Sequence, residues 1–164
     1  INEVLLKENE IINICSELAK AQDILFIARG SLYPLALEGA LKLKEISYIH
    51  AEGFSAGEMK HGPIALIDDK MPVVFIVSKK GYAKILSNIE EVKARGGKII
   101  IVTSVHNDEL NDYSDHIIYI PHTHKFLSAI LKSIPLQLLA YHIAVLKDRN
   151  VDQPRNLAKS VTVE

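Results

Sequence analysis

The chain alternates between two kinds of hydrophobic pattern. Four short runs are apolar at nearly every position, which is typical of strands buried on both faces of a sheet; they cover residues 24–28, 73–77, 99–103 and 116–120. Longer segments repeat their apolar side chains about every 3.6 residues, as amphipathic helices do; they cover residues 3–21, 33–48, 82–95 and 126–146. This alternation predicts right-handed βαβ units around a mainly parallel sheet.

The pattern therefore predicts an α/β fold, a three-layer α/β/α sandwich that is flavodoxin-like in broad shape. Its 164 residues suffice for one domain, expected over residues 1–148, with an extended polar tail over 149–164. The glycine-rich residues 51–70 predict a loop with one short helical turn, for which Ser55 and Glu58 form a capping-box pattern. Pro135 predicts a kink in the last helix.

Composition narrows the possible partners and setting. A net charge of −1 and a pI near 6.7 favour neither nucleic acid nor an acidic membrane surface, and no apolar stretch reaches the roughly 20 residues of a membrane helix. The single cysteine, Cys15, excludes an intrachain disulfide and fits a reducing, cytoplasmic setting. Its apolar neighbours predict a buried side chain rather than a nucleophile. Because the chain begins at Ile1 rather than Met, we expect a piece of a longer protein.

The helix over residues 33–48 carries the first candidate site. Glu38, Lys42 and Glu45 are spaced i, i+4 and i+7, so they share one helix face. One interpretation is a solvated charged stripe with weak ion pairs. The other is a functional face, because the stripe leads into the glycine-rich segment and long ordered loops are often functional.

Histidines provide further candidates of unequal strength. His61 precedes Gly62-Pro63, a rigid turn, and is either poised for proton transfer or bonded to the backbone. His122 and His124 bracket Thr123, but without a third ligand they do not predict a zinc site. The turn Arg29-Gly30-Ser31 follows the first strand, where ligands bind in α/β sheets, yet it lacks a phosphate-loop motif and fits a plain turn equally well.

Three motifs give the chain a specific resemblance. They are LEGALKLKEISY at residues 37–48, KHGP at 60–63 and PRNLAKSVTVE at 154–164. With these motifs the chain resembles the glucosamine-6-phosphate synthase family, whose members carry a glutaminase domain followed by two sugar-isomerase (SIS) modules. The resemblance spans the whole chain and implies that it is the second module together with the C-terminal tail.

The resemblance implies an activity and roles for six residues. The family makes glucosamine 6-phosphate from fructose 6-phosphate and glutamine-derived ammonia. Glu45 matches the carboxylate that moves a proton between C1 and C2 of the sugar, with Lys42 one turn before it and Glu38 on the same face. His61 matches the histidine linked to ring opening, which comes from the neighbouring subunit of a homodimer. Ala158 and Lys159 match the tail segment that closes over the sugar.

The same resemblance limits what this chain does alone. It lacks the N-terminal nucleophilic cysteine of the glutaminase domain and the Ser/Thr-rich phosphate loop of the first module, so we expect little turnover by the isolated chain. The expected partners are the upstream SIS module, the glutaminase domain and a second copy, and no cofactor is expected. A sugar-phosphate-binding regulatory module and a dimerisation module, built from the last helix and residues 51–63, are the alternative functions.

Overall fold

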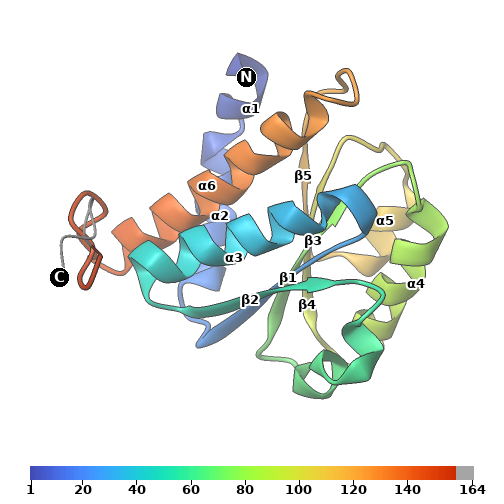
Figure 1. Cartoon of the computed structure of the whole chain (residues 1–164), viewed down its shortest axis with the longest axis horizontal. Coiled ribbons are helices and arrows are strands. Elements are labelled where there is room, and N and C mark those ends of the chain that lie inside the picture. Colours follow the sequence, from blue (N-terminus) through green and yellow to red (C-terminus); the bar gives the residue numbers. More distant parts are fainter. Residues whose placement is uncertain (158–164) are drawn as a thin grey trace, which may run out of the picture.

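The computed structural model of the chain describes residues 1–157 and contains one parallel sheet (Figure 1). Its five strands lie in the order β2-β1-β3-β4-β5. They are β1 Asp23–Ala28, β2 His50–Ser55, β3 Pro72–Val77, β4 Lys98–Thr103 and β5 His116–Tyr119. The order reverses between β1 and β3, and such a switch point opens a crevice at the carboxyl ends of the strands.

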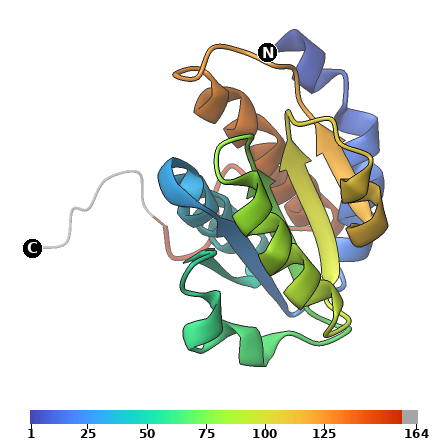
Figure 2. The same ribbon diagram turned by 90° about the vertical axis from the view of Figure 1, so that its right-hand side faces the viewer.

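Helices cover both faces of this sheet, which confirms the three-layer sandwich (Figure 2). One layer holds α1 Asn2–Leu5, α2 Glu8–Leu18, α3 Tyr33–Ser47 and α6 Ser128–Leu146. The other holds α4 Tyr82–Lys93, α5 Glu109–Tyr113 and the 3₁₀ turns η2 Met59–His61 and η3 Pro63–Leu66. A further 3₁₀ turn, η1 Gly30–Leu32, joins β1 to α3.

The core consists of two hydrophobic clusters separated by the sheet. Alternate strand residues point to opposite faces, so Phe26 and Val74 pack under α2, α3 and α6, while Leu25 and Phe75 pack under α4 and the 3₁₀ turns. Burying each such side chain contributes about 1.5–3 kcal/mol. Burial on both faces explains why the central strands are continuously apolar.

The edge strand β2 lies within the segment predicted to be a loop, and that prediction was wrong. Its residues pair with β1 from His50 opposite Asp23 to Ser55 opposite Ala28. Gly53 allows α3 to approach this strand, because an added Cβ would lie 2.7 Å from the Leu37 nitrogen and 2.8 Å from the Ala36 carbonyl. Glycine at this position therefore fixes the distance between β2 and α3.

Two local predictions also need correction. The first predicted helix is divided at Leu6-Lys7 into α1 and α2, and the side chains on either side of the break, Val4 and Ile11, are both buried. The capping box is not formed, because Ser55 ends β2 and η2 begins at Met59 without a side-chain cap. Helix α6 includes Pro135 as one continuous element, and the kink expected at this residue stays a prediction.

Helix α6 is long and apolar enough to cross a membrane by length and composition, with a mean hydropathy of 1.5 over 18 of its 19 residues. Its 19 residues stay just below the roughly 20 residues expected of a membrane helix. In the fold, α6 packs against both α2 and α3, and Leu136, Leu139 and Ile143 are buried in the core there. A buried core helix of a globular domain can be equally long and apolar, so length and hydropathy alone do not identify α6 as a membrane helix.

Cys15 is a buried core residue, as predicted. Its Sγ donates to the carbonyl oxygen of Leu139 at 3.7 Å, which ties α2 to α6. Burial raises the pKa of the Cys15 thiol to about 12. The thiol is therefore almost entirely protonated near neutral pH and is a poor nucleophile.

Candidate functional site

Helix α3 places Glu38, Lys42 and Glu45 together on one face, which we call the α3 face. All three side chains are half-buried. The Lys42 Nζ donates to Glu45 Oε2 at 2.6 Å. This hydrogen bond, reinforced by the charges of Glu45 and Glu38, raises the pKa of the Lys42 ammonium above its usual value. Lys42 therefore stays charged beside a carboxylate throughout the neutral range.

This pair has the components of an acid–base site. A carboxylate can take a proton from a bound molecule and return it to a neighbouring atom. An ammonium held beside it can stabilise negative charge that develops in between. The 2.6 Å contact and the partial burial are less typical of a solvated stripe, although an i,i+3 ion pair also occurs on ordinary helix surfaces.

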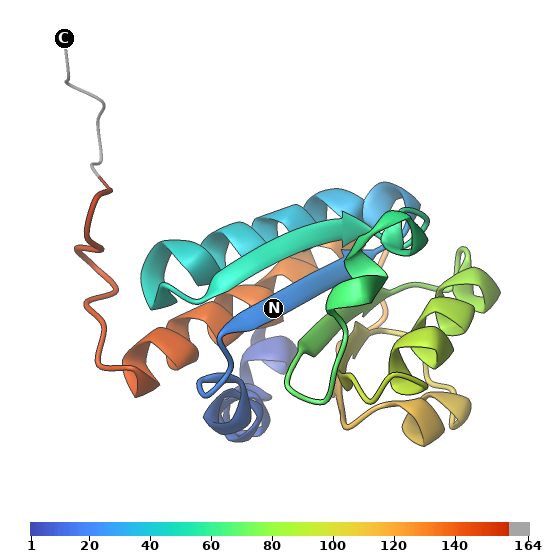
Figure 3. The same cartoon turned by 90° about the horizontal axis from the view of Figure 1, so that it is seen from below.

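The described part of the tail lies against the end of α3 that carries Glu45 (Figures 1 and 3). Tyr48 ends the helix in a left-handed conformation with φ 62°. The Arg155 backbone N–H donates to the Tyr48 hydroxyl at 2.8 Å, and the guanidinium groups of Arg155 and Arg149 lie 4.1 and 5.5 Å from the centre of its ring. The predicted tail residues Ala158 and Lys159 lie outside the described residues.

His61 is held at a different place. It ends η2 and precedes Gly62, whose φ of 147° favours glycine. The neighbouring Lys60 forms an ion pair with Glu91 of α4 at 2.7 Å. Among residues 1–157 the exposed imidazole of His61 has no hydrogen-bond partner, so the structure does not favour a histidine bonded to the backbone.

One copy of the chain does not bring His61 and Glu45 together. Helix α3 runs antiparallel to the strands, so Glu45 near its end lies at the amino edge of the sheet. The η2 turn, which carries His61, lies in the other helical layer, where Met59 is buried and Lys60 pairs with Glu91 of α4. Within one copy, Glu45 and His61 therefore belong to opposite layers of the sandwich.

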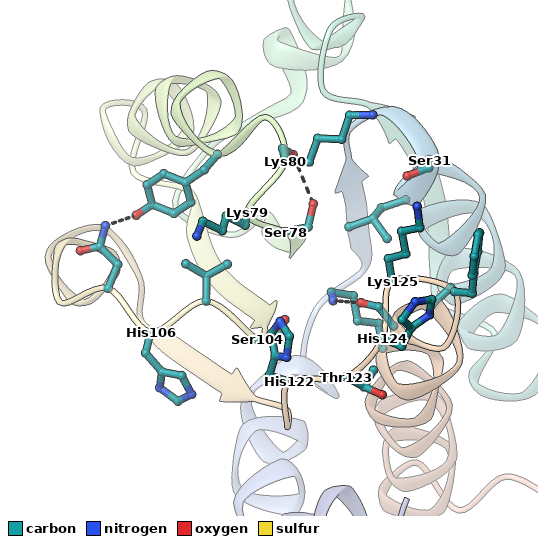
Figure 4. A pocket seen from close by; sticks show the side chains of 18 residues that line it. Ser31, Ser78, Lys79, Lys80, Ser104, His106, His122, Thr123, His124 and Lys125 are labelled. Atoms are coloured by element: carbon teal, nitrogen blue, oxygen red, sulfur yellow. Dashed lines mark hydrogen bonds between the residues drawn. The ribbon is translucent and has the colours of Figure 1, made fainter.

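A second group of polar residues surrounds a cavity of about 1300 Å³ at the carboxyl edge, which we call the carboxyl-edge pocket (Figure 4). Sequence reasoning missed it as a site, although it had singled out Ser31, His122, Thr123 and His124 separately. The lining residues come from the segments after four strands and from the start of α6. They are Ser31, Leu32, Ser78, Lys79, Lys80, Tyr82, Ser104, Val105, His106, Asn107, His122, Thr123, His124, Lys125, Phe126, Ser128, Ala129 and Lys132.

A usable signal for this pocket was present in the sequence. Ser78 directly follows β3, and Ser104 directly follows β4. Applying the rule for ligands at carboxyl strand ends to every strand, rather than to the first turn alone, would have grouped them. Within residues 1–157, no three His, Cys, Asp or Glu side chains come together in an arrangement that could hold a metal ion.

Comparison with known proteins places these features in a family. The SIS domain family model matches residues 17–147. The chain is 54% identical over its whole length to glutamine–fructose-6-phosphate aminotransferase (isomerizing) from Brucella abortus biovar 1 (strain 9-941) and to the enzyme of that name from Thermus thermophilus, and it spans 27% of each. The chain thus spans about a quarter of the length of these relatives.

A solved structure agrees with this match. The C-terminal domain of glucosamine-fructose-6-phosphate aminotransferase from Francisella tularensis superposes with a TM-score of 0.84 and 44% identity over 92% of this chain and 43% of that one. The similarity is therefore to the C-terminal portion of such aminotransferases. With the family model covering most of the described residues, the chain belongs to the SIS domain family.

Proposed function

We propose that this chain supplies one half of a sugar-phosphate isomerase site within a glutamine–fructose-6-phosphate aminotransferase. Glu45 moves a proton between C1 and C2 of fructose 6-phosphate, and Lys42 stabilises the negative charge of the enediol between these steps. The parent enzyme then yields glucosamine 6-phosphate with ammonia drawn from glutamine. The observation that carries this proposal is the 2.6 Å Lys42–Glu45 pair on α3, in a chain 54% identical to such enzymes.

The position of the tail supports a site that closes at the Glu45 end of α3. Arg149 and Arg155 lie on the Tyr48 ring, three residues after Glu45. We assign residues 1–148 to the SIS domain and residues 149–164 to the tail. Ala158 and Lys159 follow this anchor directly, and a lid formed by them would exclude water while substrate is bound.

The separation of His61 from Glu45 supports a site shared between two copies. We propose a homodimer in which His61 of one copy reaches the α3 face of the other and assists opening of the sugar ring. Exposed apolar side chains on α3, at Leu37 and Leu41, lie beside the charged face and provide surface for such an association. The first SIS module and the glutaminase domain of the parent chain are the other proposed partners, in a cytoplasmic enzyme.

The proposal is tested by the conversion of fructose 6-phosphate to glucose 6-phosphate. The assay compares this chain alone, the chain joined to the first SIS module of its parent, and the joined protein with Glu45→Gln. We expect activity only in the joined protein and a loss of about 10²-fold or more in the Gln variant, because its amide cannot accept the proton.

Glu90→Gln is the matched control, since Glu90 is an exposed carboxylate on α4, across the sheet from α3. It should keep the rate of the unaltered joined protein. Full activity in Glu45→Gln, or no activity in any joined protein, would remove the catalytic assignment and favour a binding or dimerisation role.

A further inference from the structure

Backbone conformations with a positive φ gather where the tail meets α3. Among the described residues, the non-glycine residues with such a conformation are Tyr48 at 62°, Asp148 at 53° and Asn156 at 61°. Tyr48 ends α3, and the other two flank the tail segment that returns to it (Figures 1 and 3). Such conformations are costly and persist only where the surrounding structure holds them. They therefore indicate that specific contacts hold this junction.

Tyrosine is an unusual residue at the end of a helix. Helices commonly end in a left-handed residue, which is usually glycine and sometimes asparagine. Asp148 and Asn156 have the short polar side chains that tolerate this conformation, whereas an aromatic side chain gains nothing from it locally. The reason for a tyrosine at position 48 must therefore lie in what its side chain contacts.

The Tyr48 side chain makes three polar contacts with the tail. Its hydroxyl accepts a hydrogen bond from the Arg155 backbone N–H at 2.8 Å. The guanidinium groups of Arg155 and Arg149 lie 4.1 and 5.5 Å from the centre of its ring, a range in which an aromatic face attracts a cation. Tyrosine offers a ring face and a hydroxyl acceptor together. One side chain thus holds both ends of the tail segment 149–155.

A turn between the two arginines makes this double contact possible. The Asn150 Oδ1 accepts hydrogen bonds from the backbone N–H groups of Asp152 and Gln153, each at 3.0 Å. An asparagine side chain that bonds the backbone two residues on stabilises a turn. The tail therefore folds back against Tyr48 instead of continuing the direction of α6.

We propose that Tyr48 is a positioning residue for the reaction, because it anchors the tail on the helix that carries Glu45. The inference rests on the proposed function, in which Glu45 and Lys159 act in one site. Lys159 is four residues beyond Arg155, so the anchor confines it to within about 14 Å of that residue. Without the anchor, thirteen residues separate it from Leu146 at the end of α6, a reach of up to about 45 Å.

The shorter tether predicts the size of the effect on the reaction. The effective concentration of a tethered group falls roughly as the −3/2 power of the tether length, so a change from four to thirteen residues lowers it about sixfold. Tyr48→Asn removes the ring and the hydroxyl but keeps a residue that tolerates the left-handed conformation. In the joined protein this variant should lower kcat about sixfold. Tyr48→Phe, which loses only the hydroxyl, should lower kcat less.

Two comparisons separate positioning from a general structural role. Tyr113→Asn on α5 is the matched control and should keep full kcat, since Tyr113 is a half-buried tyrosine in the opposite layer. In the joined protein with Lys159→Met, Tyr48→Asn should cause no further loss, because the group that the anchor delivers is already absent. A further loss of the same size there would overturn the role in the reaction.

Trypsin digestion of the 164-residue chain tests the anchor without any assay of activity. Cleavage after Arg155 and Arg149, followed by mass spectrometry, should be about threefold faster or more in Tyr48→Asn, because the protease needs the segment released from its contacts. Cleavage after the exposed Lys20 is the internal reference. Unchanged cleavage in Tyr48→Asn would overturn the anchor. Faster cleavage together with full activity of Glu45→Gln would confirm the anchor and overturn its role in isomerisation.

Discussion

The α3 face and the carboxyl-edge pocket lie at opposite edges of one sheet and differ in their charges. On the α3 face the Lys42 ammonium is paired with the Glu45 carboxylate at 2.6 Å, and Glu38 adds a second carboxylate. The pocket gathers lysines and a helix N-terminus with no carboxylate in its lining. An ion pair suits proton transfer, whereas an unbalanced cavity suits binding of an anion. One small domain thus carries a charge pair suited to proton transfer on α3 and a positively charged cavity at the carboxyl edge of its sheet.

The largest expected effect concerns how α3 is held in place. Gly53→Ala places a Cβ 2.7–2.8 Å from the backbone of Ala36 and Leu37, so helix and strand must move apart. We expect the free energy of unfolding to fall by about 3 kcal/mol, measured by urea denaturation. Gly57→Ala is the control, because its nearest neighbour, the Ser55 Oγ, is 3.8 Å away. Equal stability of the two variants would contradict the close approach.

Removing the cation from the α3 face should have the next largest effect. In the joined protein, Lys42→Met should lower kcat for isomerisation about tenfold to a hundredfold, because the developing negative charge loses its partner. Lys44→Met is the matched control, since Lys44 is exposed on another side of the same helix. If both variants lose activity equally, the Lys42–Glu45 pair has no special role.

Replacing the buried lysine of the carboxyl-edge pocket should have a smaller effect, and it should stabilise the protein rather than weaken it. The Lys132 side chain has an exposed fraction of 0%, and its Nζ donates to Ser128 Oγ at 2.6 Å without an ion pair within residues 1–157. Lys132→Met should raise the free energy of unfolding by about 1 kcal/mol, because it removes this buried unpaired cation. The folded-state pKa of Lys132 is lowered, so the folded protein releases this proton before the unfolded chain does. The loss of folding stability caused by the buried Lys132 ammonium is therefore complete below the lowered pKa. It decreases as the pH rises toward 10.5.

The advantage of the Met variant should accordingly shrink above neutral pH. Urea denaturation at several pH values measures this trend, with Lys20→Met, which replaces an exposed lysine, as the reference. A Met variant that is less stable than the unaltered chain at neutral pH would show that Lys132 is already compensated.

The parts of the fold that were predictable are those with strong periodic patterns. The central strands are buried on both faces, so they appear as continuous apolar runs such as Val73 to Val77. The edge strand β2 was missed because Ala51 is its single fully buried residue and Gly53 weakens any strand pattern. Strand β2 is defined by its pairing with β1 and its close contact with α3, and the hydrophobic pattern of its own residues does not reveal these contacts.

Of the two candidate sites, one could be predicted from the sequence and the other could not. The α3 face was predictable because Glu38, Lys42 and Glu45 repeat along one helix. The carboxyl-edge pocket is assembled from segments between positions 31 and 132, and each contributes an ordinary serine, lysine or histidine. The burial of Lys132, which distinguishes the pocket, depends on packing between layers. The resemblance implied that His61 comes from a second copy, and the placement of α3 and η2 in opposite layers agrees with this.

The central claim, that Glu45 and His61 act in one site across two copies, is tested most directly by mixing two inactive variants of the joined protein. Glu45→Gln and His61→Ala subunits are unfolded, combined in equal amounts and refolded, and isomerisation is measured. Random pairing would give each mixed dimer one intact site, so the account predicts recovery of about a quarter of the unaltered activity. No recovery, with each variant dimeric on its own, would contradict the shared site.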